Sequence, residues 1–342
     1  MRGIIQRTAW YLLKRLGAVL LVLFGISSVT FLVTRVLGNP VYLLVGHQQS
    51  PEIMDNMIQR MGLHRPLHEQ YLGYLWSVLH GDLGISRYTF RPVVDDIALR
   101  LPATLELVLF AMALIILVGI PLGILAAVRR GSWWDHSVQA IAQLGASVPN
   151  FWFGLLLIFF LFFLLPAFPP PLGRLDDPGQ APPAFTGLLL VDSLLAGSFR
   201  SFISALWHLI LPGLTLAAGA APATIKITRD TLIQILTSDY IRTPLAYGVD
   251  RRTVYFRYAL KNALVPVTTV LAMTMGFLMS GTVLVETVFS WPGLGLYAVT
   301  AMNHFDYEPI IAVVLISAVF YAGAYLIADV LHFMIDPRLR VL

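Results

Sequence analysis

The 342-residue chain contains no cysteine and unusually few charged residues. Without cysteine there is no disulfide framework, no thiolate zinc site and no cysteine nucleophile. Charged residues make up 12% of the chain and hydrophobic residues 57%, whereas ordinary soluble domains carry about 25% charged residues. A soluble fold of this size could not bury so much apolar surface. The composition therefore indicates a protein embedded in a lipid bilayer.

Several catalytic motifs are also missing from the sequence. Only three lysines occur and none follows a glycine, so the phosphate-binding pattern Gly-x4-Gly-Lys-Ser/Thr is absent. His64 and His68 are four residues apart, but they do not form the His-Glu-x-x-His pattern of a metalloprotease. No nucleophile elbow of the hydrolase type is present either. We therefore expect a chain that is not an enzyme and that binds no cofactor, no metal and no nucleic acid.

Long apolar stretches are what the sequence has in abundance. A helix needs about 20 apolar residues to cross a bilayer, and six stretches qualify. Pro149 and Asn150 are expected to break the third stretch, which lies inside Ser137–Gly173. The sequence thus predicts an all-α polytopic membrane protein with six transmembrane helices, approximately Leu16–Leu37, Leu105–Val128, Phe151–Phe168, Phe202–Ile225, Ala263–Val285 and Pro309–Ala328.

The N-terminal apolar stretch follows basic residues and could be mistaken for a signal peptide. The run Leu16–Val33 is too long for that, and no small-residue cleavage site follows it. We interpret it as a first span that is retained.

The distribution of lysine and arginine predicts the orientation. The segments 1–15, 129–136, 226–262 and 336–342 hold 15 of the 23 basic residues, and the alternate loops hold 8. Because basic residues favour the cytoplasmic side, both termini are expected in the cytoplasm. The expected organisation is a cytoplasmic N-terminus (1–15), a first span (16–37), a periplasmic loop (38–101), a five-helix core (102–336) that contains the cytoplasmic loop 226–262, and a cytoplasmic C-terminus (337–342).

The two long outer loops differ in character. The loop 38–101 contains two predicted short helices, Pro51–Met61 and an amphipathic one over Leu67–Leu79. The loop Phe168–Arg200 is rich in proline and glycine, and a long loop of little regular structure is usually functional or disordered.

The inner loop 226–262 is the most informative segment. It reads as a short helix from Asp239, a glycine stop at Gly248, a basic stretch with Arg251 and Arg252, and then a new span. A solvated basic loop that merely obeys the orientation rule is the simplest account of it.

The residues of this loop support a more specific interpretation. The segment resembles the coupling loop of ABC importer permeases of the dipeptide, oligopeptide and nickel branch, which typically reads Asp-Tyr-(Val/Ile)-Arg-Thr-Ala-Arg-Ala-Lys-Gly. Pro244, Leu245 and Tyr247 depart from that pattern. Because proline kinks a helix interior, Pro244 predicts a helix that starts near Thr243 or is bent. The positions that match are Asp239, Tyr240, Ile241, Arg242, Thr243, Ala246 and Gly248.

Further segments carry the same resemblance in order along the chain. They run from about residue 16 to the end, and each is weak alone while the ordered set is specific. They include Arg100-Leu101-Pro102-Ala103-Thr104, His208-Leu209-Ile210-Leu211-Pro212-Gly213, Glu286-Thr287-Val288-Phe289-Ser290-Trp291-Pro292-Gly293-Leu294-Gly295 and Asp336-Pro337-Arg338.

The resemblance implies a type I ABC importer permease fold in an inner membrane. It implies a second, similar permease, two ATPase subunits that supply ATP and magnesium chemistry, and an external solute-binding protein as partners. Asp239, Tyr240, Arg242, Thr243, Ala246, Tyr247, Gly248, Arg251 and Arg252 would then form the ATPase-coupling loop, with Tyr240 and Tyr247 as anchors and Arg242 as a charge contact. The alternative for these tyrosines is a position at the membrane interface, where tyrosine is common.

Glu286 ends the fifth predicted span beside a turn-rich segment. An ionisable residue at such a place is a functional hypothesis, so Glu286, Trp291, Gly293 and Gly295 are candidate pathway residues; the alternative is that Glu286 caps the turn. For Glu106, which follows Pro102 in a first helical turn, a structural role is favoured over substrate contact.

Two other classes of protein compete with the importer permease. A secondary transporter or channel is expected to have ionisable residues at mid-membrane depth. None of the six predicted spans has one near its centre. A membrane-embedded enzyme would need a metal motif or a nucleophile and base at recognisable spacing. The expected substrate is a di- or oligopeptide, with nickel, glutathione or another small solute as the alternative.

Overall fold

The computed structural model describes residues 2–32, 58–59 and 64–335. This part of the chain is helical apart from loops and one isolated antiparallel bridge between Ile85 and Pro92. The predicted all-α fold is therefore confirmed for the described residues. The predicted helix Pro51–Met61 falls largely outside them, as do residues 33–37 of the first predicted span and the segment 337–342.

The described helices follow one another with mostly short connections. Three turns or segments are of the wider π type (η2, η3 and η5), and η4 is a short 3-10 turn. In chain order the elements are α1 (Arg2–Leu32), α4 (Leu67–Leu79), α5 (Val93–Leu114), η2 (Ile115–Gly119), α6 (Ile120–Val128), α7 (Trp133–Ser147), α8 (Asn150–Ile158), η3 (Phe159–Leu164), η4 (Pro178–Gln180), α9 (Leu189–Leu195), α10 (Phe199–Leu236), α11 (Asp239–Ala246), α12 (Arg251–Thr253), η5 (Val254–Ala259), α13 (Leu260–Val288), α14 (Leu294–Asn303) and α15 (Tyr307–Ile335).

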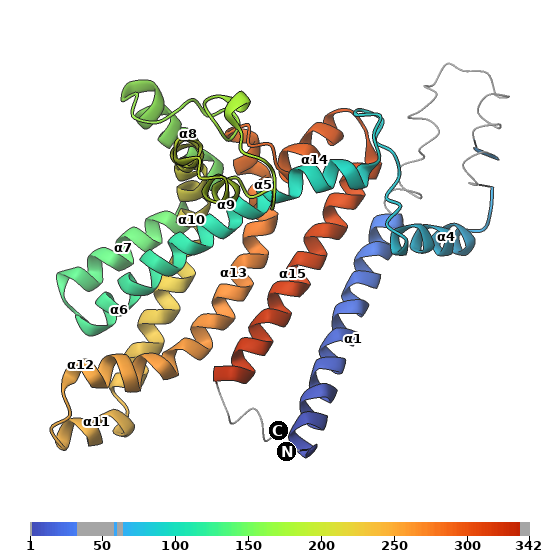
Figure 1. Ribbon diagram of the computed structural model, residues 1–342. Coiled ribbons are helices and arrows are strands. Elements are labelled where there is room, and N and C mark those ends of the chain that lie inside the picture. The colour runs from blue at the N-terminus through green and yellow to red at the C-terminus, as the bar shows by residue number, and fades with distance from the viewer. Residues whose placement is uncertain (1, 33–57, 60–63, 336–342) are drawn as a thin grey trace. The chain divides into compact units, whose positions relative to one another are not determined.

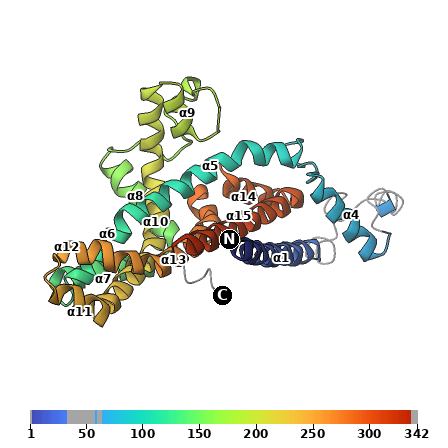
Figure 2. The ribbon, with the colours of Figure 1, turned by 60° about the horizontal axis from the view of Figure 1, so that its bottom comes forward.

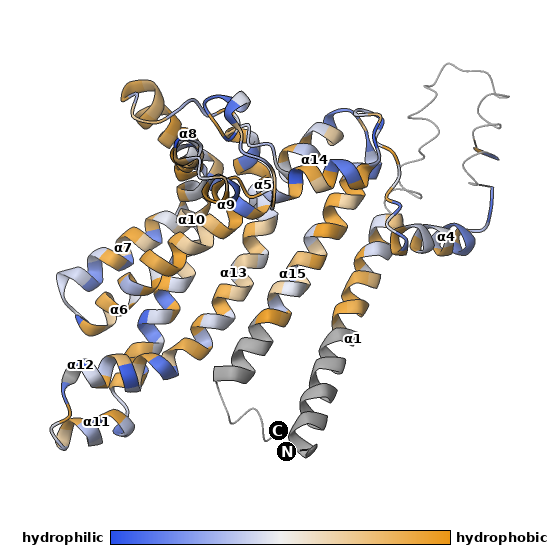
Figure 3. Ribbon diagram, in the orientation of Figure 1, coloured by the Kyte–Doolittle hydropathy of each residue, from blue (hydrophilic) through white to orange (hydrophobic). Residues whose placement is uncertain are grey.

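Four helical runs in the described part of the chain are long and apolar enough to cross a membrane. They are Val93–Val128, Phe199–Leu236, Val254–Val288 and Tyr307–Ile327, and the bent pair formed by α7 with α8 and η3 makes a fifth candidate. Gly17–Leu32 is a shorter apolar helix. Figure 3 shows the apolar colouring along α5, α6, α13 and α15. The count of six spans and the location of both termini stay predictions.

The third apolar stretch is broken where the sequence predicts it. The two helical segments Trp133–Ser147 and Asn150–Leu164 meet at an angle of 101°. Val148 has extended backbone angles and Pro149 precedes the first turn of α8. A residue before proline avoids the helical region, so the local sequence by itself accounts for the break.

The π turn η2 also has a local cause. Pro121 follows it in the first turn of α6, and proline has no N–H to donate to the carbonyl four residues earlier. A π turn accommodates such a gap in the hydrogen-bond ladder while the helix continues. The run Val93–Val128 therefore stays one continuous candidate span.

The chain divides into two compact units, residues 1–100 with 297–319 and residues 101–296 with 320–342. In the first unit, α1 and α4 pack together, and the loop before α5 is fixed to the start of α15. The buried Asp306 carboxylate accepts hydrogen bonds from the Ser86 hydroxyl (2.7 Å) and from the Arg87 and Tyr88 amides (2.8 and 3.2 Å). A single carboxylate thus orders the backbone of the loop before α5.

The second unit is organised around α10. This helix packs against α6, α7, α8 and α13, which lie beside it in both views (Figures 1 and 2). The hydrophobic core gathers side chains from α5, α10 and α13, among them Leu107, Leu209 and Leu278, all fully buried. Each of the three helices buries one stripe and leaves apolar residues exposed on the rest of its surface, as expected of membrane helices.

Candidate functional site

The predicted coupling segment forms the short helix α11, which contacts the second unit through Ile241 and through the Tyr240 ring, whose centroid lies 6.3 Å from that of Tyr258 in η5. Ile241 is its only buried residue, and it packs in a cluster with Leu232 of α10 and with Val254, Ala259 and others. Ser238 precedes the helix in an extended conformation, and Gly248 follows it with φ +80°. Glycine adopts such a positive φ without steric cost, so the stop that the sequence predicts at Gly248 is confirmed.

The helix begins earlier than one of the predicted alternatives. It starts at Asp239 and runs through Pro244 to Ala246, so a start near Thr243 is wrong. Pro244 cannot donate to the carbonyl of Tyr240, but the turn is supported by neighbouring bonds. The Thr243 hydroxyl donates to the Asp239 carbonyl (3.1 Å), and the Val249 amide donates to the Pro244 carbonyl (3.0 Å).

The predicted coupling residues on and next to α11 are exposed. Tyr247 is 86% exposed, and Tyr240 and Ala246 are exposed as well. Arg242 is 71% exposed in its side chain and pairs only loosely with Asp239 (3.5 Å). A large aromatic and an arginine held out on a short anchored helix have the composition of a protein-binding hot spot.

The basic stretch that follows begins the next helical run. Arg251 opens α12, and the Asp250 carboxylate accepts from the Thr253 amide (3.2 Å), which is a helix-capping bond. Arg252 is exposed. The nine predicted coupling residues thus lie within one continuous segment, Asp239–Arg252, at the junction of α10, α11 and α12.

An ion pair that sequence reasoning missed fixes α7 to α10. The buried Asp135 carboxylate receives two hydrogen bonds from Arg229, Nε to Oδ1 (2.6 Å) and Nη2 to Oδ2 (2.9 Å). It also accepts from the Gly131 amide (2.9 Å) and the Gln139 amide group (2.8 Å). Two signals were available in the sequence: an aspartate in the first turn of a helix after a serine cap, and an arginine near the end of a largely apolar helix. Nothing in the sequence pairs residues that are 94 positions apart.

The four candidate pathway residues meet in one packed cluster of the second unit. The Glu286 carboxylate is fully buried and accepts from the Thr104 hydroxyl (2.7 Å) and from the Gly295 and Leu296 amides (2.7 and 3.1 Å). These amides belong to the first turn of α14, where a carboxylate suits the helix dipole. Of the two roles considered for Glu286, these hydrogen bonds fit the cap of the turn.

Trp291 and the two glycines complete this cluster. The Trp291 ring is buried, and its Nε1 donates to the Ala103 carbonyl (2.9 Å). A Cβ atom at Gly293 would lie 2.5 Å from the Glu286 carboxylate, and one at Gly295 would lie 2.5 Å from the Val283 backbone. Both glycines are therefore required by close packing rather than by backbone conformation.

The buried Glu106 carboxylate fastens the proline-rich loop between η3 and α10 to α5. Glu106 accepts from Arg174 (2.5 Å) and from the Leu190 amide (2.6 Å). These contacts agree with the structural role predicted for Glu106, but the predicted place in a first helical turn is wrong, because α5 starts at Val93 and runs through Pro102. Within the same loop, Asp192 accepts from the Thr186 amide and hydroxyl and from the Gly187 amide. Burial alone would raise the pKa of Asp192, but these hydrogen bonds hold it below its usual range.

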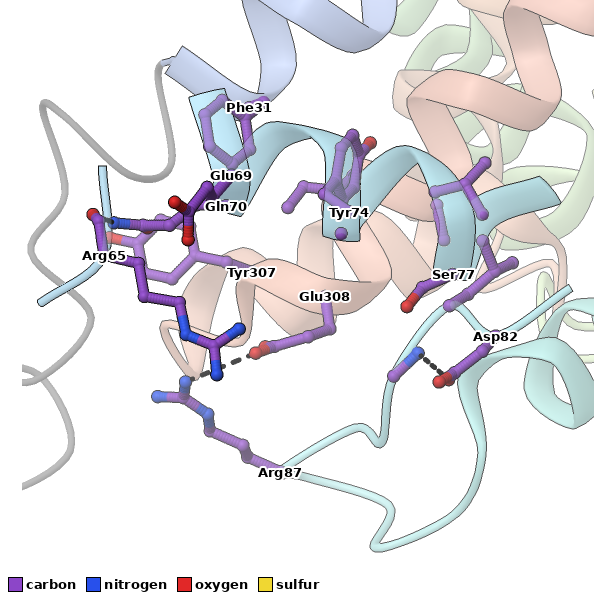
Figure 4. Close-up of a pocket in the computed structure, with 16 residues that line it drawn as sticks. Phe31, Arg65, Glu69, Gln70, Tyr74, Ser77, Asp82, Arg87, Tyr307 and Glu308 are labelled. Carbon is purple, nitrogen blue, oxygen red and sulfur yellow. Dashed lines mark hydrogen bonds and ion pairs between the residues drawn. The ribbon is translucent and has the colours of Figure 1, made fainter. Parts of the chain in front are cut away.

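The first unit contains a polar pocket of about 410 Å³. α4 forms one wall together with Phe31 of α1, and the loop before α5 and the start of α15 form the others (Figure 4). The Arg65 and Arg87 guanidinium groups lie on the same side of it as the Glu308 carboxylate, and Arg87 pairs with Glu308 at 3.4 Å. Glu69 and Asp82 also line the pocket, so charges of both signs face the same space. Among the described residues, no group of histidines and carboxylates has the arrangement of a metal site.

Comparison with known proteins places this architecture in one family. Residues 119–341 match the family model described as "binding-protein-dependent transport system inner membrane component", and residues 9–108 match the N-terminal model of the same systems. A probable D,D-dipeptide transport system permease of Escherichia coli K12 is 41% identical over 334 residues, covering 97% of this chain and 98% of the relative. A dipeptide transport system permease of the same strain is 38% identical over 335 residues, covering 96% and 98%.

A third relative carries a different substrate in its name. It is a glutathione transport system permease of Escherichia coli O6:H1, 35% identical over 331 residues, with 96% of this chain and 98% of the relative covered. The family matches span nearly the whole sequence, including the exposed helix α11 and the cluster around Glu286. The chain belongs to the family of inner-membrane permease components of binding-protein-dependent transport systems.

Proposed function

We propose that this chain is one permease subunit of an ATP-driven importer of short peptides. The observation that carries the proposal is the exposed helix α11, which displays Tyr240, Arg242 and Tyr247 while only Ile241 is buried. A helix with this surface is suited to bind another protein. The peptide substrate rests on the dipeptide permeases of Escherichia coli that are 38–41% identical over nearly the full length.

In this proposal the chain has six spans with both termini in the cytoplasm, and the segment Asp239–Arg252 docks on an ATPase subunit. Two such subunits bind ATP and magnesium, and a second permease of similar fold completes the pathway. A solute-binding protein delivers the peptide at the outer face. The pathway runs between the permeases, and the cluster around Glu286 supports its outer end.

Coupling would work by a difference in contact between two states of the ATPase pair. Transport is driven only if the ATPases bind α11 differently before and after they close. Because Ile241 ties α11 to the core cluster shared with α10 and η5, a displacement of α11 is passed to those helices. The ion pair Asp135–Arg229 then joins α10 to α7.

The first test is purification of the tagged chain from its native membrane in mild detergent, followed by identification of every protein that accompanies it. A second permease and two ATPase subunits are expected. A chain that purifies alone as a stable self-oligomer would refute the importer assignment and favour a secondary carrier.

The docking helix is tested in the same preparation. Tyr247→Ala combined with Arg242→Glu is expected to lower the amount of ATPase recovered per permease. Trp133→Ala is the control, because it removes an aromatic side chain that is 64% exposed but lies on α7. Equal ATPase recovery from the double variant and the control would refute the docking role.

The substrate is tested by uptake into vesicles that contain the purified complex, its binding protein and ATP. Accumulation of labelled dipeptide is expected. The glutathione permease relative at 35% identity makes glutathione the second candidate. Saturable uptake of glutathione without dipeptide uptake would decide for that substrate.

A further inference from the structure

Helix α4 lies across the end of α1 within the first unit (Figures 1 and 2). The contact is made by Tyr71, whose hydroxyl hydrogen-bonds with the Ser28 hydroxyl (2.6 Å) and the Ser27 hydroxyl (3.2 Å) of α1. Its ring also packs against Phe24 and Phe31, with centroids 5.9 and 5.2 Å away. Ser28 is four residues before Leu32, the last described residue of α1, or about 6 Å along the helix. The crossing point is therefore near the end of the described part of α1, and in the sequence Arg35 and then Gly38-Asn39-Pro40 follow this apolar stretch within a few residues.

The sides of α4 differ sharply in their surroundings. Gly73, Tyr74 and Ser77 line the polar pocket (Figure 4). Leu72, Trp76 and Leu79, at positions i, i+4 and i+7, share another side and are 63%, 67% and 79% exposed. Residues at this spacing form one stripe on a helix. Three large apolar side chains aligned and uncovered in this way mark a contact surface rather than a solvated face.

The exposed surface of α1 has the same character. Leu21, Phe24 and Val29 are more than half exposed, as expected of side chains that face lipid. The stripe of Leu72, Trp76 and Leu79 on α4 therefore adjoins the lipid-facing surface of α1. The two meet near the place where the first apolar stretch of the sequence approaches its end. The Trp76 ring also packs at a tilt against the His80 ring, with centroids 4.1 Å apart. Tryptophan is enriched at the boundary between hydrocarbon and water because its ring is amphipathic.

We propose that α4 is an interfacial anchor whose Leu72–Trp76–Leu79 stripe lies in the membrane leaflet at which α1 ends. An amphipathic helix that lies in the plane of the membrane buries its apolar face at the boundary of headgroups and acyl chains. α4 contains no lysine or arginine, so the ligand is the apolar upper part of phospholipid in general, not an anionic headgroup. The inference requires only that α1 crosses a membrane, and it is independent of the substrate.

The anchor also explains how the pocket wall is held. Phe31 of α1 and Tyr74 of α4 both line the pocket, and their rings lie 5.7 Å apart. With one side of α4 in lipid, the opposite side is fixed at the level of the membrane surface and faces the aqueous pocket. Adjacent residues such as Leu72 and Gly73 would then meet two different solvents.

The absence of native cysteine makes this testable, because a single introduced cysteine carries a spin label at one site. Leu72→Cys, Trp76→Cys and Leu79→Cys are compared with Gly73→Cys in the full chain, reconstituted in vesicles of neutral or partly anionic phospholipid. Gly73 lines the pocket, and a Cβ atom there meets no other atom within 4 Å. Leu21→Cys, 73% exposed on α1, serves as the reference for hydrocarbon.

Collision of the label with oxygen, which concentrates in lipid, is measured against collision with a water-soluble nickel chelate. The oxygen-to-nickel ratio is expected to be several-fold higher at 72, 76 and 79 than at 73, to approach that of 21, and to be the same in both lipid mixtures. High nickel access at 76 would overturn the proposal in favour of a solvated helix. Low access to both reagents at 76 would overturn it in favour of a protein partner, and a high ratio only in anionic vesicles would overturn the stated lipid chemistry.

Discussion

Removing one partner of the Asp135–Arg229 ion pair should destabilise the chain by different amounts depending on which partner is lost. Arg229→Met leaves the Asp135 carboxylate, whose side chain is 2% exposed, with only the Gly131 amide and the Gln139 side chain as donors. Stranding a buried charge in this way costs about 3–5 kcal/mol. Asp135→Asn leaves Arg229, which is 17% exposed and still bonded to Asp230 at 2.8 Å. That loss is expected to be smaller, about 1–3 kcal/mol.

The measurement is the free energy of unfolding of the purified chain in detergent, with melting temperature as a first comparison. Arg130→Met is the matched control, because Arg130 is an exposed arginine on the neighbouring turn. The double variant Asp135→Asn with Arg229→Met should lose less stability than the two single variants together, since neither charge is then left unpaired. A larger loss for Asp135→Asn than for Arg229→Met, or strict additivity in the double variant, would refute the reasoning.

Three further predictions concern the other carboxylates and α11. Glu286→Gln keeps an oxygen for the two amides of α14 and should lower the free energy of unfolding by about 1 kcal/mol. Glu286→Ala leaves three buried donors without an acceptor and should lower it by about 1–3 kcal/mol for each donor. Equal melting temperatures for the two variants would contradict this. Gly248→Pro forces the φ of residue 248 from +80° toward about −65° and should lower the amount of substrate taken up per ATP hydrolysed. Gly248→Ala should lower it only weakly. Normal uptake per ATP in the proline variant would refute the coupling role. Because the folded pKa of Asp192 is depressed, its contribution to stability is present above the unfolded value of about 3.9 and is lost as the pH falls through the folded value. Protease cleavage of the loop 166–198 should therefore rise in strongly acid solution. Asp192→Asn should raise cleavage at neutral pH and remove this pH dependence. An unchanged pH profile of cleavage in the variant would contradict the role of Asp192.

Local signals in the sequence predicted the elements that depend on local chemistry. The helix Leu67–Leu79 has the predicted bounds, because its apolar periodicity and its flanking Pro66 are both local. The break at Pro149 and the stop at Gly248 follow from the backbone restrictions of single residues. Helix ends were less predictable: α10 extends to Leu236, past Ile225, where the predicted span ends. Its polar continuation, which includes Lys226 and Arg229, is equally able to form helix outside an apolar environment, so hydropathy indicates the end of an apolar stretch and not the end of the helix.

Residue roles that depend on distant partners were harder to predict. The sequence identified Glu286 as an unusual residue, but only the fold reveals that its carboxylate faces the amides of α14 rather than an opening. It could not pair Asp135 with Arg229, because any of several inner-loop acids was an equally good partner. For the coupling segment, the residues were predicted by resemblance, whereas the burial of Ile241 among residues of α10 and η5 emerges only from three-dimensional packing.

The small attachment of α11 has a mechanical consequence. The helix is held on one side only, by the buried Ile241 side chain and by the contact of the Tyr240 ring with Tyr258 of η5. It is flanked by turns at Ser238 and Gly248, so its orientation can adjust over a short distance while a displacement still reaches α10 and η5. A protein that binds its exposed side therefore need not match its orientation in advance.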